Sequence, residues 1–180
     1  LENRKIKLNY LTNKDFEAIK IAKRYNIKNY ALSFTSSSDD IKKFELILKK
    51  ENKIYKIETK KAINNLNSII KEGSNFLIDR GDLSKETSIE DIPMLQRKIF
   101  KTSKKFKNKK IYIATNLLES MIYNKYPTRG EANDIYNSLE MGASGLVLAA
   151  ETAVGKFPKE AVKFLIKMIN SYKNEKKYIK

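Results

Sequence analysis

Five short apolar runs recur along the chain, and longer amphipathic stretches separate them. The runs have the length of β-strands and are rich in β-branched and aromatic residues. They lie at residues 30–34, 53–58, 75–79, 110–115 and 145–149. The pattern therefore predicts five strands.

The stretches between the runs carry apolar residues at spacings of three and four, which is typical of amphipathic helices. They cover residues 13–25, 38–50, 62–72, 88–106, 128–141 and 158–172. One helix followed by five strand–helix units predicts an α/β fold with a parallel sheet and right-handed crossovers. No repeat or linker divides the 180 residues, so we expect one domain over residues 1–172 and a frayed basic C-terminal tail over residues 173–180.

The composition narrows the chemistry. The chain has no cysteine and no histidine, which excludes disulfides, thiolate or histidine metal sites, and catalytic triads that need either residue. No apolar stretch reaches the roughly 20 residues of a membrane helix. We therefore expect no membrane partner and a cytoplasmic location.

The charge is strongly basic, with 37 lysines and arginines against 21 acidic residues and a net charge of +16. Such a balance raises the question of nucleic acid. However, only five of the basic residues are arginines, the side chain that base recognition favours. A solvated lysine surface is the better interpretation, and nucleic acid is not an expected partner.

Polar side chains follow the predicted strands where those strands end. Glu58, Asp82, Thr115 and Glu151 lie at or just beyond a strand end, which is the face where parallel α/β folds bind ligands. Two carboxylates there, Glu58 and Asp82, offer the oxygen ligands that Mg²⁺ prefers. On spacing alone, two surface carboxylates remain an equal alternative.

Several motifs are more specific than composition. They are Lys56-Ile-Glu58, Arg80-Gly-Asp-Leu83, the run ATNLLESM at 114–121, Pro127-Thr-Arg129 and the run ETAVG at 151–155. In this order they resemble the catalytic barrel of pyruvate kinase. The resemblance implies a partial parallel β/α barrel of the TIM type, holding strands four to eight and lacking the first three.

The resemblance also implies roles for the matching residues. Glu58 and Asp82 would hold Mg²⁺ or Mn²⁺, and Lys56 would stabilise the phosphoryl group in transfer. The loop amides of Gly81 and Asp82 would bind the carboxylate of phosphoenolpyruvate. Thr115 would contact the substrate and help to deliver a proton to the enolate. K⁺ is a second candidate ion, but its binding residues belong to strands outside this sequence.

Four further residues are candidates for the site or for a structural role. Arg80 and Arg129 are expected to orient Asp82 and Glu119, respectively, or to bridge to a neighbouring subunit. Glu151 could equally reach the site or cap the following turn.

The sequence also departs from the family pattern. Asp79 stands where the family has a small apolar residue and adds negative charge beside the metal site. Ala149-Ala150 replaces Ser-Gly before Glu151 and loses a hydroxyl.

Three functions remain open. The first is phosphoryl transfer from phosphoenolpyruvate to ADP, giving pyruvate and ATP. The others are a Mg²⁺-enolate lyase or aldolase, and a non-catalytic binding or interaction module. An open set of parallel strands leaves exposed edges, so we expect either a homo-oligomer or a complementary chain that supplies the missing strands.

Overall fold

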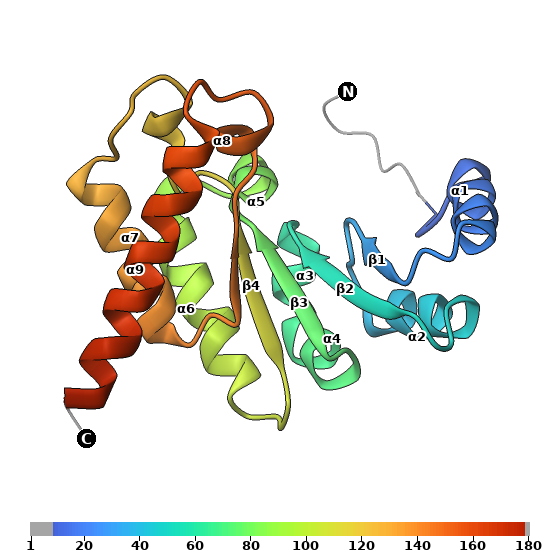
Figure 1. The fold of residues 1–180 in the computed structure, drawn as a ribbon. Helices are drawn as coiled ribbons and strands as arrows, with labels where there is room; N and C mark the ends of the chain where they lie inside the picture. The colour runs from blue at the N-terminus through green and yellow to red at the C-terminus, as the bar shows by residue number, and fades with distance from the viewer. Residues whose placement is uncertain (1–8, 179–180) are drawn as a thin grey trace.

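The computed structural model describes the backbone of residues 9–178. Five parallel strands form one sheet, with each strand beside its neighbours in the sequence (Figure 1). The strands are β1 (Asn29–Leu32), β2 (Asn52–Ile57), β3 (Asn75–Asp79), β4 (Lys110–Ala114) and β5 (Gly145–Val147). The α/β fold and the parallel sheet are confirmed, and β5 is two residues shorter than predicted.

Helices connect the strands. The longer ones are α1 (Asn13–Arg24), α2 (Ser38–Ile47), α6 (Ile92–Ser103), α7 (Arg129–Met141) and α9 (Pro158–Tyr178). The helix α9 continues six residues beyond the predicted end at Tyr172. The backbone of most of the expected frayed tail is therefore helical. No helix in the described part of the chain is both long and apolar enough to cross a membrane.

Short helices account for the main differences from the predicted elements. The single helix expected over 62–72 is two helices, α3 (Lys60–Asn64) and α4 (Leu66–Glu72). Asn65 lies at the break, and its side chain donates a hydrogen bond to the carbonyl of Ser36 at 2.8 Å. Three elements were not predicted, namely α5 (Arg80–Glu86), η2 (Glu119–Ile122) and α8 (Ala150–Ala153).

The helix expected over 88–106 begins later. A 3₁₀ turn, η1 (Ile89–Asp91), precedes α6, and Pro93 lies in the first turn of α6. Proline is tolerated there because the first amides of a helix have no partner within the helix.

Side-chain caps set the start of three longer helices. Thr12, Ser37 and Thr128 each accept a hydrogen bond from the third residue of the following helix, and an acidic side chain there returns the bond. These reciprocal pairs are capping boxes, which satisfy backbone donors that a helix start leaves unpaired. Residue pairs three apart in the sequence therefore fix where α1, α2 and α7 begin.

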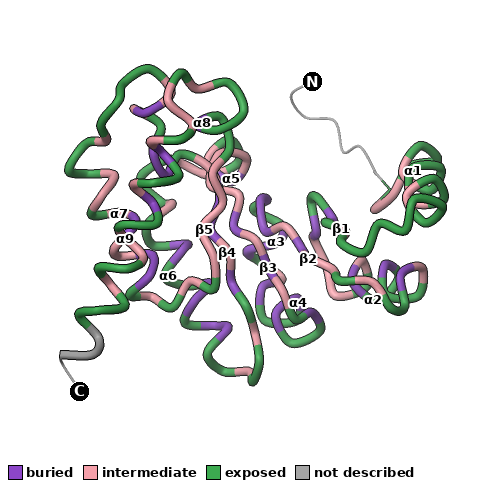
Figure 2. The backbone as a smooth tube through the Cα atoms, in the orientation of Figure 1, coloured by how far each residue is buried: buried purple, intermediate pink, exposed green. Residues whose placement is uncertain are grey.

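The two faces of the sheet differ in burial. Tyr55, Ile57, Phe76 and Ile78 point to one face and are almost completely buried in the core formed with the helices. Buried positions accordingly follow the strands and the inner sides of the helices (Figure 2). The alternate residues of β2, β3 and β4 point to the other face and, apart from the buried Ala114, are partly or fully exposed.

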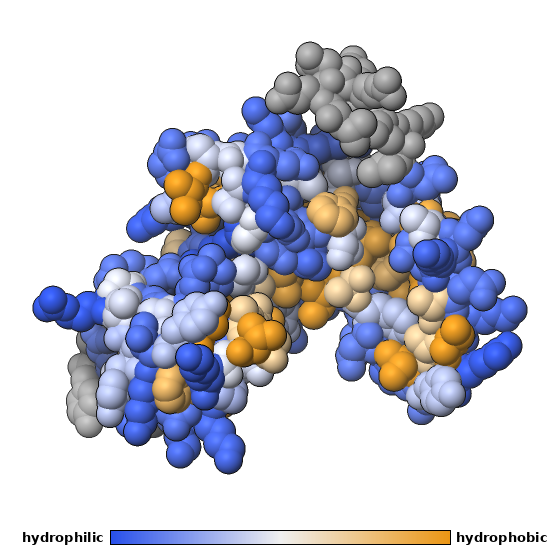
Figure 3. All heavy atoms as spheres, turned by 90° about the horizontal axis from the view of Figure 1, so that it is seen from above, coloured by the Kyte–Doolittle hydropathy of each residue, from blue (hydrophilic) through white to orange (hydrophobic). Residues whose placement is uncertain are grey.

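This second face lines a hollow on the side of the sheet that the helices leave open. Viewed from above, apolar residues gather along that hollow (Figure 3). Such a surface has the shape and polarity of the interior of a barrel that has been opened along its length.

Candidate functional site

The candidate site lies where β2, β3 and β4 end. Lys56 is the penultimate residue of β2, and Asp79 is the last residue of β3. Glu58 and Thr115 directly follow β2 and β4. Lys56 and Asp79 occupy alternate positions to the buried residues, so their side chains lie on the open face.

Lys56 forms the centre of the cluster. Its Nζ lies 2.8 Å from Oε2 of Glu58 and 3.0 Å from Oδ2 of Asp79. Burial disfavours the charged ammonium, but close pairing with the two carboxylates outweighs this effect. The pKa of Lys56 therefore lies above its usual value. Lys56 remains a cation at neutral pH.

Glu58 is fixed from two sides and is only 1% exposed. Its Oε1 accepts a hydrogen bond from the backbone N–H of Phe34 at 2.6 Å. Its Oε2 is buried and has no hydrogen bond of good geometry within the described structure, although Lys56 lies close to it. The Lys56 ammonium, 2.8 Å away, supplies the counter-charge for this buried oxygen.

Asp79 joins the ends of β3 and β4. Its Oδ1 accepts a hydrogen bond from the Thr115 hydroxyl at 2.8 Å and a longer one from the amide of Asp82 at 3.4 Å. Burial raises the pKa of Asp79, but the bonds from Lys56 and Thr115 lower it more, so the pKa is below its usual value. Asp79 also caps the start of α5.

Three carboxylates meet at this point. One oxygen from each of Glu58, Asp79 and Asp82 lies within 4.8 Å of the others. Hard carboxylate oxygens in such a group suit Mg²⁺ or Mn²⁺. Asp82 is the least buried of the three, and its Oδ1 pairs with the exposed ammonium of Lys85 at 2.8 Å.

Gly81 approaches the end of β4 closely. A Cβ built on Gly81 would lie 2.9 Å from Cγ2 of Thr115, closer than atoms of real side chains come. Glycine is therefore the residue that lets α5 start against Thr115. It also leaves the amide of Gly81 free of an adjacent side chain.

Arg80 does not orient Asp82 as expected. Its Nε and Nη2 donate to the backbone carbonyl of Thr115 at 3.1 and 2.7 Å, and its Nη1 pairs with Asp134 at 2.5 Å. Thr115 and Asn116 both have positive φ, at 76° and 56°. Asparagine tolerates such an angle, but a β-branched residue such as threonine does not, so Arg80 holds a strained backbone at Thr115.

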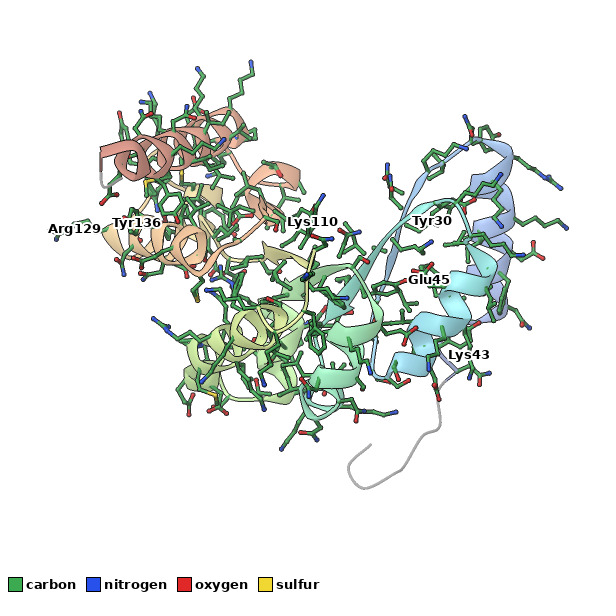
Figure 4. The ribbon with its side chains drawn as sticks, turned by 90° about the horizontal axis from the view of Figure 1, so that it is seen from below. Tyr30, Lys43, Glu45, Lys110, Arg129 and Tyr136 are labelled. Carbon is green, nitrogen blue, oxygen red and sulfur yellow. The ribbon has the colours of Figure 1, made fainter. Side chains whose placement is uncertain are left out.

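Glu119 and Arg129 lie outside the cluster. Both are exposed, and neither an ion pair nor a hydrogen bond joins their side chains in the described part of the chain. Arg129 begins α7 and points away from the body of the molecule (Figure 4). The carboxylate that binds the start of η2 is instead Glu131, which accepts hydrogen bonds from the amide and hydroxyl of Ser120 at 2.7 and 2.6 Å.

Glu151 caps backbone rather than reaching the cluster. It is 1% exposed, and it accepts hydrogen bonds from the amides of Leu118 and Ala149 at 3.1 and 2.7 Å. It thus ties the segment after β4 to the segment after β5. Of its two expected roles, the structure shows the structural one.

Sequence reasoning missed some of these contacts. The Phe34 amide could not be identified, because any residue offers one. The capping box from Thr128 to Glu131 was a readable signal for Glu131, since a threonine followed three residues later by glutamate is its pattern. Asp134 gave no local signal, because its partner is 54 residues away.

Fold and site together define a segment of a parallel β/α barrel, with a lysine among three carboxylates at the strand ends. The family model for the pyruvate kinase barrel domain matches residues 1–162. The chain therefore belongs to the pyruvate kinase family.

Similar proteins of known name support the same family. The chain is 44% identical to the pyruvate kinase of Thermotoga maritima over 162 residues, which cover 88% of this chain and 34% of that protein. It is 36% identical to the pyruvate kinase of Methanocaldococcus jannaschii, over 93% of this chain and 38% of that protein. It is 38% identical to pyruvate kinase isozyme G of Nicotiana tabacum, over 86% and 28%. The chain thus spans about a third of the length of these relatives.

Proposed function

We propose that this chain supplies the phosphoryl- and metal-binding side of a pyruvate kinase active site. The reaction would move a phosphoryl group from the enol oxygen of phosphoenolpyruvate to the terminal phosphate oxygen of ADP. The resulting enolate would take up a proton at its methylene carbon and become pyruvate. The observation that carries this proposal is the Lys56 ammonium, held between Glu58 and Asp79 at the strand ends.

The donor set fits a divalent cation. Glu58 and Asp82 would hold Mg²⁺ or Mn²⁺, and the approach of one oxygen from each, with one from Asp79, to within 4.8 Å of the others supports that assignment. A bound Mg²⁺ would neutralise negative charge on the substrate oxygens. K⁺ stays a prediction from the resemblance, because none of these residues is assigned to bind it.

The residues of the chain would do the remaining work by position and charge. Phosphoryl transfer needs little covalent assistance, so a fixed cation beside the moving group is a main requirement. Lys56 would supply it. The amides of Gly81 and Asp82 would bind the substrate carboxylate, and the Thr115 hydroxyl would face the enolate.

A complete barrel would need further strands. In the described structure β1 and β5 are the two edges of the sheet, and the open face carries polar site residues beside apolar ones. We propose that strands from elsewhere in the protein, or from a partner chain, cover this face and complete the site for ADP.

A second candidate is a non-catalytic binding module of the same family. The observation that favours it is Asp79, which already pairs with both Lys56 and Thr115. A site whose ligand-binding groups are engaged internally would bind ligand weakly and turn over slowly.

The test is titration with oxalate, a mimic of enolpyruvate, with and without Mn²⁺. Glu58→Gln and Asp82→Asn should each weaken metal-dependent binding at least about tenfold, since each removes a charged ligand. The matched controls Glu17→Gln and Asp39→Asn, at exposed positions, should leave it unchanged. Absence of binding, or binding indifferent to both site carboxylates, would refute the metal site. A protein that contains the complete barrel and binds oxalate, but transfers no phosphoryl group from phosphoenolpyruvate to ADP, would favour the binding module.

A further inference from the structure

Asp79 makes the contacts that a bound anion would make. Its carboxylate lies 3.0 Å from the Lys56 ammonium and accepts the Thr115 hydrogen bond at 2.8 Å. Its side chain is 16% exposed, so solvent screens these contacts only in part. The Asp79 carboxylate therefore engages both the Lys56 ammonium at the end of β2 and the Thr115 hydroxyl at the end of β4.

The local charge opposes a second anion. Glu58, Asp79 and Asp82 bring three negative charges, against the ammonium of Lys56 and the exposed ammonium of Lys85. The Arg80 guanidinium is directed to the Thr115 carbonyl and to Asp134, so it offers this cluster no donor. A carboxylate or phosphoryl ligand arriving alone would meet net negative charge, and it would have to displace Asp79 from its partners.

We propose that Asp79 determines the order and strength of ligand binding, because its carboxylate occupies Lys56 and Thr115 in place of an anionic ligand. A divalent cation must bind first. A cation held by Glu58, Asp79 and Asp82 would offset the charge that repels the ligand. The inference rests on the proposed function only in taking Lys56 and Thr115 as ligand-binding groups.

Removing the Asp79 carboxylate should therefore strengthen anion binding. Asp79→Ala should bind oxalate about tenfold more tightly than the wild type in the presence of Mn²⁺, and measurably without any metal. The wild type should bind oxalate only with Mn²⁺. Affinity for Mn²⁺ alone should fall several-fold in Asp79→Ala, because one carboxylate of the cluster is lost. Isothermal titration calorimetry measures all three affinities.

Two further variants make the result specific. Asp79→Asn keeps a hydrogen-bond acceptor for Thr115 and for the start of α5 but has no charge. It should resemble Asp79→Ala in oxalate binding, and it preserves the test if the alanine variant fails to fold. Asp39→Ala removes a carboxylate at an exposed position near the start of α2 and should bind as the wild type does.

The outcomes separate the two proposals. Equal oxalate affinity in the wild type and both Asp79 variants would overturn the inference and leave the proposed function standing. Metal-independent oxalate binding by the wild type would overturn it as well. If neither the wild type nor either Asp79 variant binds oxalate with Mn²⁺, the proposed function is overturned, and the inference with it.

Discussion

Replacing Arg80 with lysine should destabilise the backbone around Thr115. The guanidinium makes two hydrogen bonds to the Thr115 carbonyl and a separate one to Asp134. Its side chain is 11% exposed, so water does not readily replace these partners. Lysine carries a single ammonium on a flexible stem and cannot reproduce the planar fork that spans both groups.

The magnitude follows from the contacts. The positive φ of the β-branched Thr115 costs on the order of 1 kcal/mol and persists only where its surroundings hold it. Asn116 adds less, because asparagine tolerates its φ of 56°. A hydrogen bond from a charged donor contributes about 1.5–3 kcal/mol. Lysine can keep one of the bonds, so Arg80→Lys should lower the unfolding free energy by about 2 kcal/mol and Arg80→Ala by about 3 kcal/mol.

Asp134 provides the control. Its side chain is 36% exposed, and an ion pair open to solvent contributes about 0–1 kcal/mol. Asp134→Asn should therefore cost less than 1 kcal/mol. Urea denaturation followed by circular dichroism measures all three variants.

Hydrogen exchange gives a local check, since the amides that follow Thr115 should lose protection in Arg80→Lys before the rest of the sheet does. If Arg80→Lys costs no more than Asp134→Asn, the fork on the carbonyl is not what holds this backbone.

Three other contacts give smaller tests. Gly142 has a φ of 103°, so Gly142→Ala should cost about 1–2 kcal/mol. Gly130→Ala, near the start of α7, where a Cβ would make only an ordinary contact of 3.8 Å with Oγ1 of Thr128, should gain about 0.5–1 kcal/mol; equal effects on urea denaturation would contradict this. Glu151→Gln should cost about 2 kcal/mol because a charged acceptor of two backbone amides is lost; an unchanged Tm would refute it. Burial raises the pKa of Glu131, but hydrogen bonds from neighbouring hydroxyls and amides lower it below 4.5. Its stabilising effect is therefore complete above about pH 4.5 and is lost as the pH falls through the lower folded-state pKa. The wild type should lose more unfolding free energy than Glu131→Gln on going from about pH 5 to pH 3, and parallel curves would count against this reasoning.

The strands were predictable because their signal is local. Alternating buried residues such as Phe76 and Ile78 mark β3 without knowledge of its neighbours. The helix α5 has no such signal, because only Leu83 among its seven residues is buried. It forms where Asp79 caps it, and so the segment after β3 was expected to be a loop. The break at Asn65 depends on the distant Ser36 carbonyl, which periodicity cannot reveal.

The residues at the strand ends of the site were predictable, but their long-range partners were not. Glu58, Asp82 and Thr115 could be grouped because strand ends of a parallel sheet meet at one edge. Their hydrogen-bond partners could not be grouped in this way. Arg80 contacts Thr115 and Asp134, which lie 35 and 54 residues further along the chain, and only the packing of α7 brings Asp134 within reach.

The register of the sheet explains why one residue, Asp79, can engage groups on both sides. Asp79 is paired with Ala114, the residue before Thr115, and Leu77, two residues before Asp79, is paired with Lys56. A carboxylate at the end of β3 is therefore flanked by a lysine and a threonine whose side chains reach it without any movement of the backbone. The internal pairing stabilises the carboxyl-terminal end of the sheet, and it engages the Lys56 ammonium that the proposed ligand would need. On the proposal made above, Asp79, which stabilises this end of the sheet, would also weaken the affinity of the site for anions, and a bound cation would offset that effect.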